Sequence, residues 1–239
     1  MQKKLKYRTL DILSVVREPL LMLFMIMPPF AAIILRILVS ILSGVLDKHL
    51  GFDLMAYAPY IQSMVILMVP MMLGMFTAFI MLDEMDLGLI PLMRTMPGSL
   101  RGYLLRRFLL PAILTVVYIP LNVWIMGMME VPFGLMLWLI LLGVMQMLFF
   151  ASLIFSNSPD KVAGLAIGKA SGLFMLPCFA PLLSSSWTLW VARLTPLYYI
   201  TAMLKDGFDT PMIFGALVVN AVYLAFFFMV MVRRIRSLH

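Results

Sequence analysis

One charged stretch, residues 83–107 (DEMDLGLIPLMRTMPGSLRGYLLRR), is the only long charged segment that separates two apolar runs of this chain. Acidic residues open it and arginines follow toward its end, which suits the macrodipole of a helix that begins at Asp83. The pattern therefore predicts a short helix from Asp83 to about Thr95. Pro97-Gly98 then signals a turn, and Ser99 can cap a new helix that leads into the next apolar run. A helix–turn–helix of this kind at a membrane face favours contact with another protein.

The composition around this stretch is that of an integral membrane protein. The 239 residues are 64% hydrophobic and 12% charged, with a mean hydropathy of +1.06, whereas soluble domains are about 45–50% apolar and about 25% charged. The net charge of +7 does not indicate nucleic-acid binding, because the basic residues cluster at the ends of apolar runs. The one cysteine, Cys178, excludes an intrachain disulfide.

Six apolar runs are long enough to cross a bilayer, which takes about 20 residues per helix. The predicted fold is therefore all-α, with a single transmembrane domain over residues 1–239. The predicted spans cover residues 20–42, 61–82, 108–128, 133–155, 162–183 and 211–232, with a polar-tipped loop at 43–60.

Two further segments are predicted to lie at the membrane surface. Residues 3–18 would place charged and apolar side chains on opposite sides of a helix, which predicts an amphipathic interfacial helix; the alternative is a basic flank that only fixes the orientation. Trp187 and Trp190 precede the sixth span, and tryptophan favours the membrane interface. A short outer helix over residues 187–194, lying at the surface or dipping into it, is therefore expected.

The basic residues also predict the orientation. With six spans the two termini share a side, and most of the 18 Lys and Arg residues lie on that side. By the positive-inside rule, both termini and residues 83–107 are cytoplasmic. Arg36 falls within the first span, where it either snorkels outward or faces a cavity.

No catalytic or metal-binding cluster is visible in the sequence. The two histidines, His49 and His239, lie outside the spans and near no Cys or carboxylate cluster, so neither a catalytic residue nor a metal ligand is predicted. Asp and Glu are missing from the middle of every span, which argues against an ion-coupled transporter. The sequence shows neither the ring of charged residues nor the selectivity filter that is typical of a channel. The chain has no evident energy source of its own, which favours a subunit driven by a separate ATPase.

The fifth span carries glycines at intervals of four, at Gly164, Gly168 and Gly172. Small residues let helix backbones approach closely, so helix packing is their predicted role. Gly168-Lys169 is not a phosphate-binding loop, because Ala163 and Ala170 stand where a Walker A motif needs Gly and Ser/Thr.

The charged stretch resembles the permeases of ATP-binding-cassette (ABC) exporters of the type-2 export class, which move drugs, antibiotics, lipids and polysaccharides. The residues that carry the resemblance are Asp83-Glu84, Gly88, Leu92, Arg94-Thr95, Pro97, Ser99 and Tyr103-Leu104-Leu105. The segment Trp190–Tyr199 (WVARLTPLYY) is similar to the one that precedes the last span of these permeases. Two positions depart from the pattern, since Pro91 stands where a helix former is usual and Met85 where an arginine is frequent.

The resemblance implies a non-enzymatic permease in a bacterial-type plasma membrane that moves a lipophilic drug, peptide antibiotic or lipid-like substrate out of the cytoplasm. It implies a separate ABC ATPase subunit in two copies, which would bind ATP and Mg, and a second permease, identical or related. No cofactor is expected on this chain; membrane lipid is an expected partner and nucleic acid is not. The alternative is a membrane anchor or assembly protein that docks a soluble partner through residues 83–107 and transports nothing.

The resemblance also implies two sets of site residues. The residues expected to contact the ATPase are Glu84, Asp86, Gly88, Leu92 and Arg94 in a coupling helix, and Ser158, Pro159, Asp160 and Lys161 in a shorter loop. The second and fifth spans line the substrate path in such permeases, and the candidates there are Met64, Met68, Met72, Phe76, Phe174 and Phe179. Methionine makes an adaptable apolar surface, although packing or lipid contact is the simpler interpretation for any single methionine.

Overall fold

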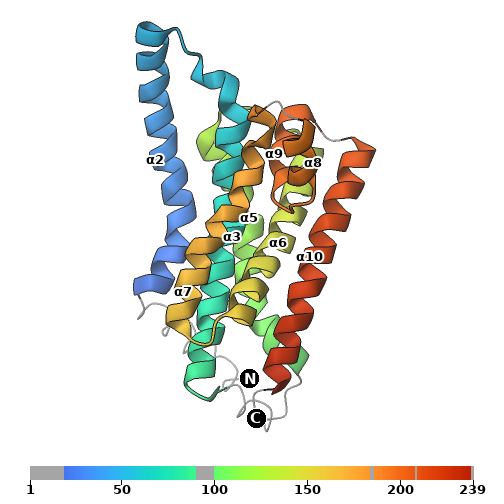
Figure 1. The fold of residues 1–239 in the computed structure, drawn as a ribbon. Coiled ribbons are helices and arrows are strands. Elements are labelled where there is room, and N and C mark those ends of the chain that lie inside the picture. The colour runs from blue at the N-terminus through green and yellow to red at the C-terminus, as the bar shows by residue number, and fades with distance from the viewer. Residues whose placement is uncertain (1–18, 90–99, 184–185, 208, 238–239) are drawn as a thin grey trace.

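A computed structural model shows long helices standing side by side in one bundle (Figure 1). The residues that it describes are 19–89, 100–183, 186–207 and 209–237. The elements in chain order are α2 (Pro19–Leu50), η1 (Leu54–Tyr57), α3 (Ala58–Asp86), α5 (Leu100–Met126), α6 (Phe133–Asn157), α7 (Lys161–Ala170), η2 (Ser171–Leu182), α8 (Ser186–Arg193), α9 (Tyr198–Asp206) and α10 (Thr210–Ser237). None of the described residues is in a strand, so the predicted all-α fold class is confirmed.

Six helical segments are long and apolar enough to cross a membrane, as the sequence predicts. They are Leu21–His49, Leu54–Asp86, Leu100–Met126, Phe133–Asn157, Lys161–Leu182 and Thr210–Ser237. The interfacial helix predicted at 3–18 lies outside the described residues.

The first span is longer than predicted, and the long loop predicted at 43–60 is wrong. The helix α2 continues to Leu50, because Ile41, Leu42 and Val45 extend its apolar pattern past the polar tip at Ser43. A short η1 follows, capped by Asp53, whose Oδ1 accepts a hydrogen bond from the Met55 N–H at 2.9 Å.

The core of the bundle is built around α3, the most buried of the six spans. Its close approach to α6 depends on Gly74, where an added Cβ would lie 2.6 Å from the Phe150 Cβ and 2.9 Å from the Met147 carbonyl oxygen. Phe76 and Phe79 of α3 are also fully buried, and the Phe79 ring lies 5.4 Å from the ring of Phe24 in α2. Because lipid tails are as apolar as these side chains, tight packing rather than the hydrophobic effect holds such helices together.

The fifth span changes its winding halfway. It is α-helical in α7 and becomes a 3₁₀-helix in η2, although 3₁₀ runs seldom exceed three or four residues. Pro177 and Pro181 lie within η2, and each removes a backbone donor and obstructs regular α-helical winding. The span that is expected to line a path is therefore the least regular one.

The short helices α8 and α9 form a hairpin beside the upper ends of α6 and α10 (Figure 1). The carbonyl of Pro196, in the turn, accepts hydrogen bonds from Gln146 Nε2 of α6 at 3.0 Å and Asn220 Nδ2 of α10 at 3.2 Å. The Tyr199 hydroxyl donates to the Arg193 carbonyl at 2.8 Å, and burial raises the pKa of Tyr199. A helix, α8, does lie at the predicted outer segment, whereas α9 was not predicted.

Candidate functional site

The acidic residues of the charged stretch form the last turn of α3. The helix runs without a break to Asp86, and the Leu87 N–H donates to the Asp83 carbonyl at 3.0 Å. Gly88 then turns the chain with φ +67°, a left-handed conformation that glycine adopts most easily. The prediction that a new helix begins at Asp83 is wrong, because the glycine and not the acidic cluster marks the boundary. Leu92 and Arg94 of the predicted coupling helix lie outside the described residues.

Acidic side chains at the C-terminal end of a helix face the negative end of its dipole and need compensating cations. Glu84 receives one from α5. The Glu84 side chain is only 8% exposed, and its carboxylate accepts hydrogen bonds from the Tyr103 hydroxyl at 2.8 Å and from Arg107 Nε at 3.1 Å. Arg107 Nη2 also donates to the other carboxylate oxygen, which makes the ion pair bidentate.

Asp83 receives its cation from α7. The Lys161 Nζ lies 2.7 Å from Asp83 Oδ2 in a partly buried ion pair. The neighbouring Asp160 caps α7, since its Oδ1 accepts a hydrogen bond from the Ala163 N–H at 2.8 Å. The loop before α7 is thus fixed to the end of α3.

A third basic side chain, Arg234, approaches from α10. Its Nη2 donates to Met85 Sδ at 3.6 Å, and its Nη1 donates to the Phe155 carbonyl of α6. The guanidinium also lies over the Phe155 ring, 5.2 Å from its centre. Side chains from α5, α7 and α10 therefore converge on one turn, and we call this group of Asp83, Glu84, Tyr103, Arg107, Lys161 and Arg234 the α3 clamp.

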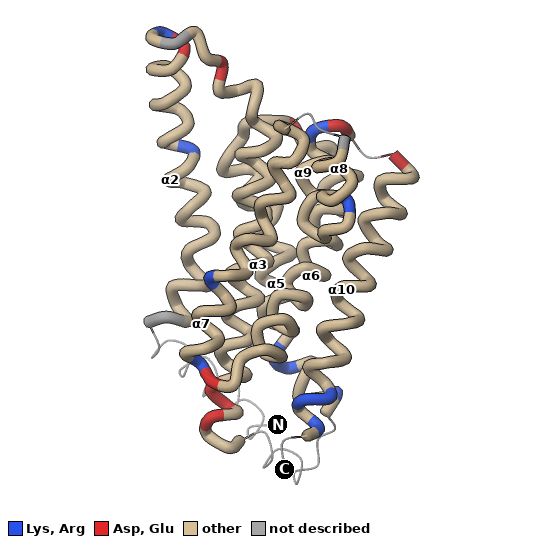
Figure 2. The backbone as a smooth tube through the Cα atoms, viewed as in Figure 1, with Lys and Arg blue, Asp and Glu red and all other residues tan. Residues whose placement is uncertain are grey.

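The predicted ATPase contacts divide into buried and exposed residues. Beyond the clamp, Asp86 and Gly88 are exposed, and the neighbouring Leu87 is 72% exposed. Figure 2 shows acidic residues gathered at this lower end of α3. Glu84, in contrast, is buried within the clamp.

The shorter predicted contact loop is divided in the same way. Pro159 and Asp160 are exposed, and Lys161 is half-buried in its ion pair. Ser158 is buried, with its hydroxyl donating to the Ile154 carbonyl at 2.6 Å.

The candidate path residues of α3 lie along one side of that helix. Met64 is exposed, and Met68 and Met72 are half-buried, although most of the helix is buried. Spaced by four, the three methionines form a single stripe. Phe76, the next member, is fully buried in the core.

The two candidates in η2 differ in their surroundings. The Phe174 ring packs edge-on against Phe149 of α6, with ring centres 5.7 Å apart, so it belongs to the packed interior. Phe179 is half-buried and makes no ring contact with another described aromatic residue. Leu173 and Leu176, on the same helix, are exposed.

The glycines of the fifth span face α3. An added Cβ at Gly164 would lie 2.6 Å from Leu82 Cδ1, and one at Gly168 would lie 2.5 Å from Met75 Cε. At Gly172 the nearest atom, Met71 Cε, would be 3.8 Å away, which is an ordinary contact. The first two positions therefore bring α7 close to α3, and the third leaves room.

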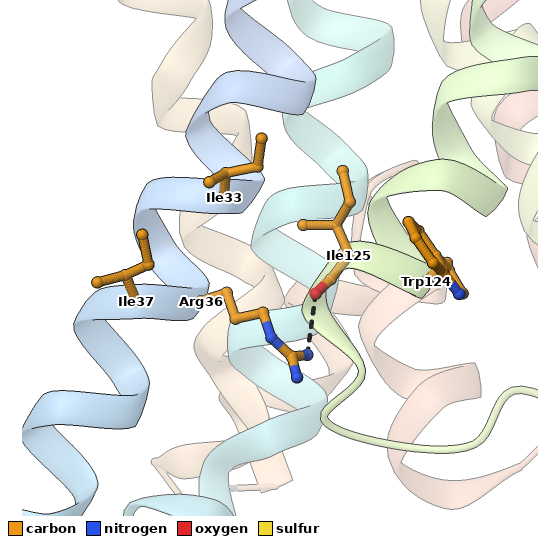
Figure 3. Close-up of a pocket in the computed structure, with 5 residues that line it drawn as sticks. All are labelled: Ile33, Arg36, Ile37, Trp124 and Ile125. Atoms are coloured by element: carbon orange, nitrogen blue, oxygen red, sulfur yellow. Dashed lines mark hydrogen bonds between the residues drawn. The ribbon is translucent and has the colours of Figure 1, made fainter.

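Arg36 joins α2 to the upper end of α5. Its Nη1 donates to the Ile125 carbonyl at 2.9 Å (Figure 3) and to the Met126 carbonyl, where a cation suits the negative end of the helix dipole. The guanidinium also lines a shallow pocket with Ile33, Ile37, Trp124 and Ile125. It thus caps α5 instead of extending along α2 toward the helix end.

Several residues that hold the helices together were not predicted from the sequence. Tyr103 and Arg107 are spaced by four and so share a helix face, which could have indicated a common partner. Gln146 and Asn220 are isolated amides in apolar spans, and such groups usually find a buried partner.

The bundle and the clamp define a class of protein before any comparison is made: a multi-pass membrane protein with a charged joint at one end. Among the described residues, no group of three or more His, Cys, Asp or Glu could hold a metal ion.

The chain belongs to the Rv2686c-like family of fluoroquinolones export permease proteins, whose family model matches residues 11–232. Two relatives, both named fluoroquinolones export permease protein, come from Mycobacterium tuberculosis strains H37Rv and CDC 1551. Each is 28% identical, over 96% of this chain and 92% of the relative. No solved structure matches the chain. The resemblance to ABC drug-export permeases is thereby confirmed, and the chain is a transport subunit rather than an enzyme.

Proposed function

We propose that the chain is the membrane subunit of an ATP-driven drug exporter, energised by two copies of a separate ATPase and completed by a second permease, identical or related. Both termini and the α3 clamp lie in the cytoplasm in this proposal. The observation that supports it best is the clamp itself. Its ion pairs join the turn before exposed Asp86 to α5 through Arg107 and to α7 through Lys161, so a force applied to that turn reaches two other spans.

The residues of the charged stretch then have separate roles. Asp86, Gly88, Leu92 and Arg94 contact the ATPase, together with Pro159 and Asp160 of the shorter loop. Glu84 is buried and paired with Arg107, so it transmits movement and does not touch the partner. Lys161 links the two contact segments through Asp83, so both segments move together when ATP closes the ATPase subunits.

The substrate path runs along the methionine stripe of α3 and the irregular η2. Met64, Met68 and Met72 offer an adaptable apolar wall, and Phe179 adds a half-buried aromatic ring. The irregular winding of η2 supports a wall that changes shape during transport. A fluoroquinolone, for which the relatives are named, is the first substrate to test; a peptide antibiotic or lipid-like molecule is the alternative.

The test begins with purification of the tagged full-length chain from its native membrane in mild detergent. A stoichiometric partner with nucleotide-binding motifs and ATPase activity is expected, and the reconstituted complex should move a fluoroquinolone only with ATP. Gly88→Pro removes the left-handed turn and should abolish transport while the chain still inserts into the membrane. A chain that purifies alone, or with a partner lacking nucleotide motifs, would establish the membrane-anchor alternative.

A further inference from the structure

Four exposed arginines lie at the lower ends of two helices, α5 and α10. Arg101 and Arg106 belong to the first turns of α5, and Arg233 and Arg236 to the last turns of α10. All four are exposed, and none of these side chains forms a hydrogen bond or ion pair with a residue that the structure describes. We call these four residues the arginine rim.

The two pairs belong to neighbouring helix ends. The rings of Phe108 in α5 and Phe228 in α10 lie 6.3 Å apart, and buried Leu104 and Ile235 belong to the same core. Figure 2 shows the basic residues at the lower end of α10 and the acidic residues at the lower end of α3, on different sides of the bundle. The two pairs therefore lie at neighbouring helix ends, and the pair on α10 lies on a different side of the bundle from the acidic turn.

One arginine of each pair also ends an exposed apolar stripe. On α5, Arg101 is followed at intervals of four by Leu105, which is 68% exposed, and Leu109, and these positions share one helix face. On α10, Phe226 (61% exposed) and Met229 precede Arg233 on one face. Apolar stripes that continue along membrane spans are covered by acyl chains or by another membrane helix, not by a soluble partner. The arginine at the end of each stripe favours lipid, because an anionic headgroup carries the opposite charge. The charge at the end of each stripe then meets the lipid headgroups.

We propose that this face of α5 and α10 binds anionic phospholipids, with acyl chains along the two stripes and the phosphate between the arginines. Guanidinium groups bind phosphate oxygens through paired hydrogen bonds. The leaflet that meets this end is the cytoplasmic one in the proposed orientation, where anionic lipids attract basic residues. The proposal does not depend on which substrate is moved or on whether an ATPase is the partner.

The experiment is native mass spectrometry of the purified full-length chain, titrated separately with phosphatidylglycerol and phosphatidylcholine. The wild type should bind phosphatidylglycerol more tightly. Each arginine near an anionic surface contributes roughly a factor of five, so Arg101→Gln/Arg106→Gln and Arg233→Gln/Arg236→Gln should each weaken phosphatidylglycerol binding about twenty-five-fold. The control Lys48→Gln/Lys205→Gln removes the same charge from exposed positions at the upper end and should leave binding unchanged.

The matching Arg→Lys pairs keep the charge but lose the paired guanidinium hydrogen bonds. They should keep the preference for phosphatidylglycerol over phosphatidylcholine with weaker binding than the wild type, so they test the proposal even if a Gln variant folds poorly. Equal binding of the two lipids by the wild type would overturn it, as would wild-type binding in both Gln variants. Loss of a soluble partner from those variants with unchanged lipid binding would also overturn it, and would assign the rim to that partner.

Discussion

The lower ends of α3 and α10 carry their charges in opposite ways. The last turn of α3 is acidic, and its charges are paired with cations from α5 and α7. The last turns of α10 are basic, and Arg233 and Arg236 are exposed there. Charged residues inside the bundle thus connect helices through ion pairs, whereas those outside it remain exposed at the surface.

Adjacent arginines show that the helix face decides between these uses. On α5, Arg107 points inward to Glu84, whereas Arg106 is exposed. On α10, Arg234 points inward to α3 and α6, whereas Arg233 is exposed. Neighbouring positions on a helix are about 100° apart. A shift of one residue therefore changes an arginine that pairs with another helix into one that is exposed.

The largest expected effect comes from breaking the buried pair of the clamp. Arg107→Leu removes the bidentate guanidinium that pairs with the buried Glu84 carboxylate, which should lower the free energy of unfolding by about 3–5 kcal/mol. The matched change Arg106→Leu removes the same charge from the exposed face and should cost about 0.5 kcal/mol or less. Denaturant titration of both variants in detergent micelles measures the difference.

A second variant tests whether the loss comes from an unpaired charge. In Glu84→Leu/Arg107→Leu both charges are gone, and such replacements are often close to neutral, so more than half of the lost stability should return. Equal, small losses in Arg107→Leu and Arg106→Leu would mean that the clamp pair is as solvated as the rim.

The next effect comes from the hydroxyl that supports the same carboxylate. Tyr103→Phe removes the 2.8 Å hydrogen bond to Glu84 and keeps the ring, and a hydrogen bond to a charged group contributes about 1.5–3 kcal/mol. We expect a loss in that range, measured by the same titration. Tyr118→Phe, on the same helix with no hydroxyl hydrogen bond to a described residue, is the control and should change stability much less.

The sequence predicted the spans well because each is an apolar run bounded by charge, a local pattern. The end of α3 could not be predicted in this way. Acidic residues favour the start of a helix, so Asp83 and Glu84 indicated a beginning. They end a helix instead because Arg107 and Lys161 supply cations from elsewhere in the chain.

The hairpin of α8 and α9 also depends on contacts from distant segments, which a local sequence pattern does not predict. The Pro196 carbonyl, in the turn between α8 and α9, accepts hydrogen bonds from Gln146 and Asn220 of two distant spans. These contacts stabilise two helices too short to be stable alone. For the candidate site, Asp86 and Gly88 are exposed as docking requires, while Glu84 is buried. Burial of a carboxylate depends on which arginine of α5 faces it, and the pattern of α5 alone does not determine that.

The smallest expected loss of stability comes from the outer ion pair of the clamp, Lys161–Asp83, in contrast to the inner pair, Arg107–Glu84. Lys161 and Asp83 keep roughly a quarter of their side chains exposed, so their attraction is partly screened, and such pairs contribute about 0.2–1 kcal/mol. Lys161→Met should therefore reduce stability by no more than about 1 kcal/mol and be sensitive to salt, whereas Arg107→Leu should not be. Lys169→Met, at an exposed position of α7, is the matched control. If Lys161→Met cost as much as Arg107→Leu, the two pairs would form one buried network, and the distinction between an inner joint and a screened outer pair would fail.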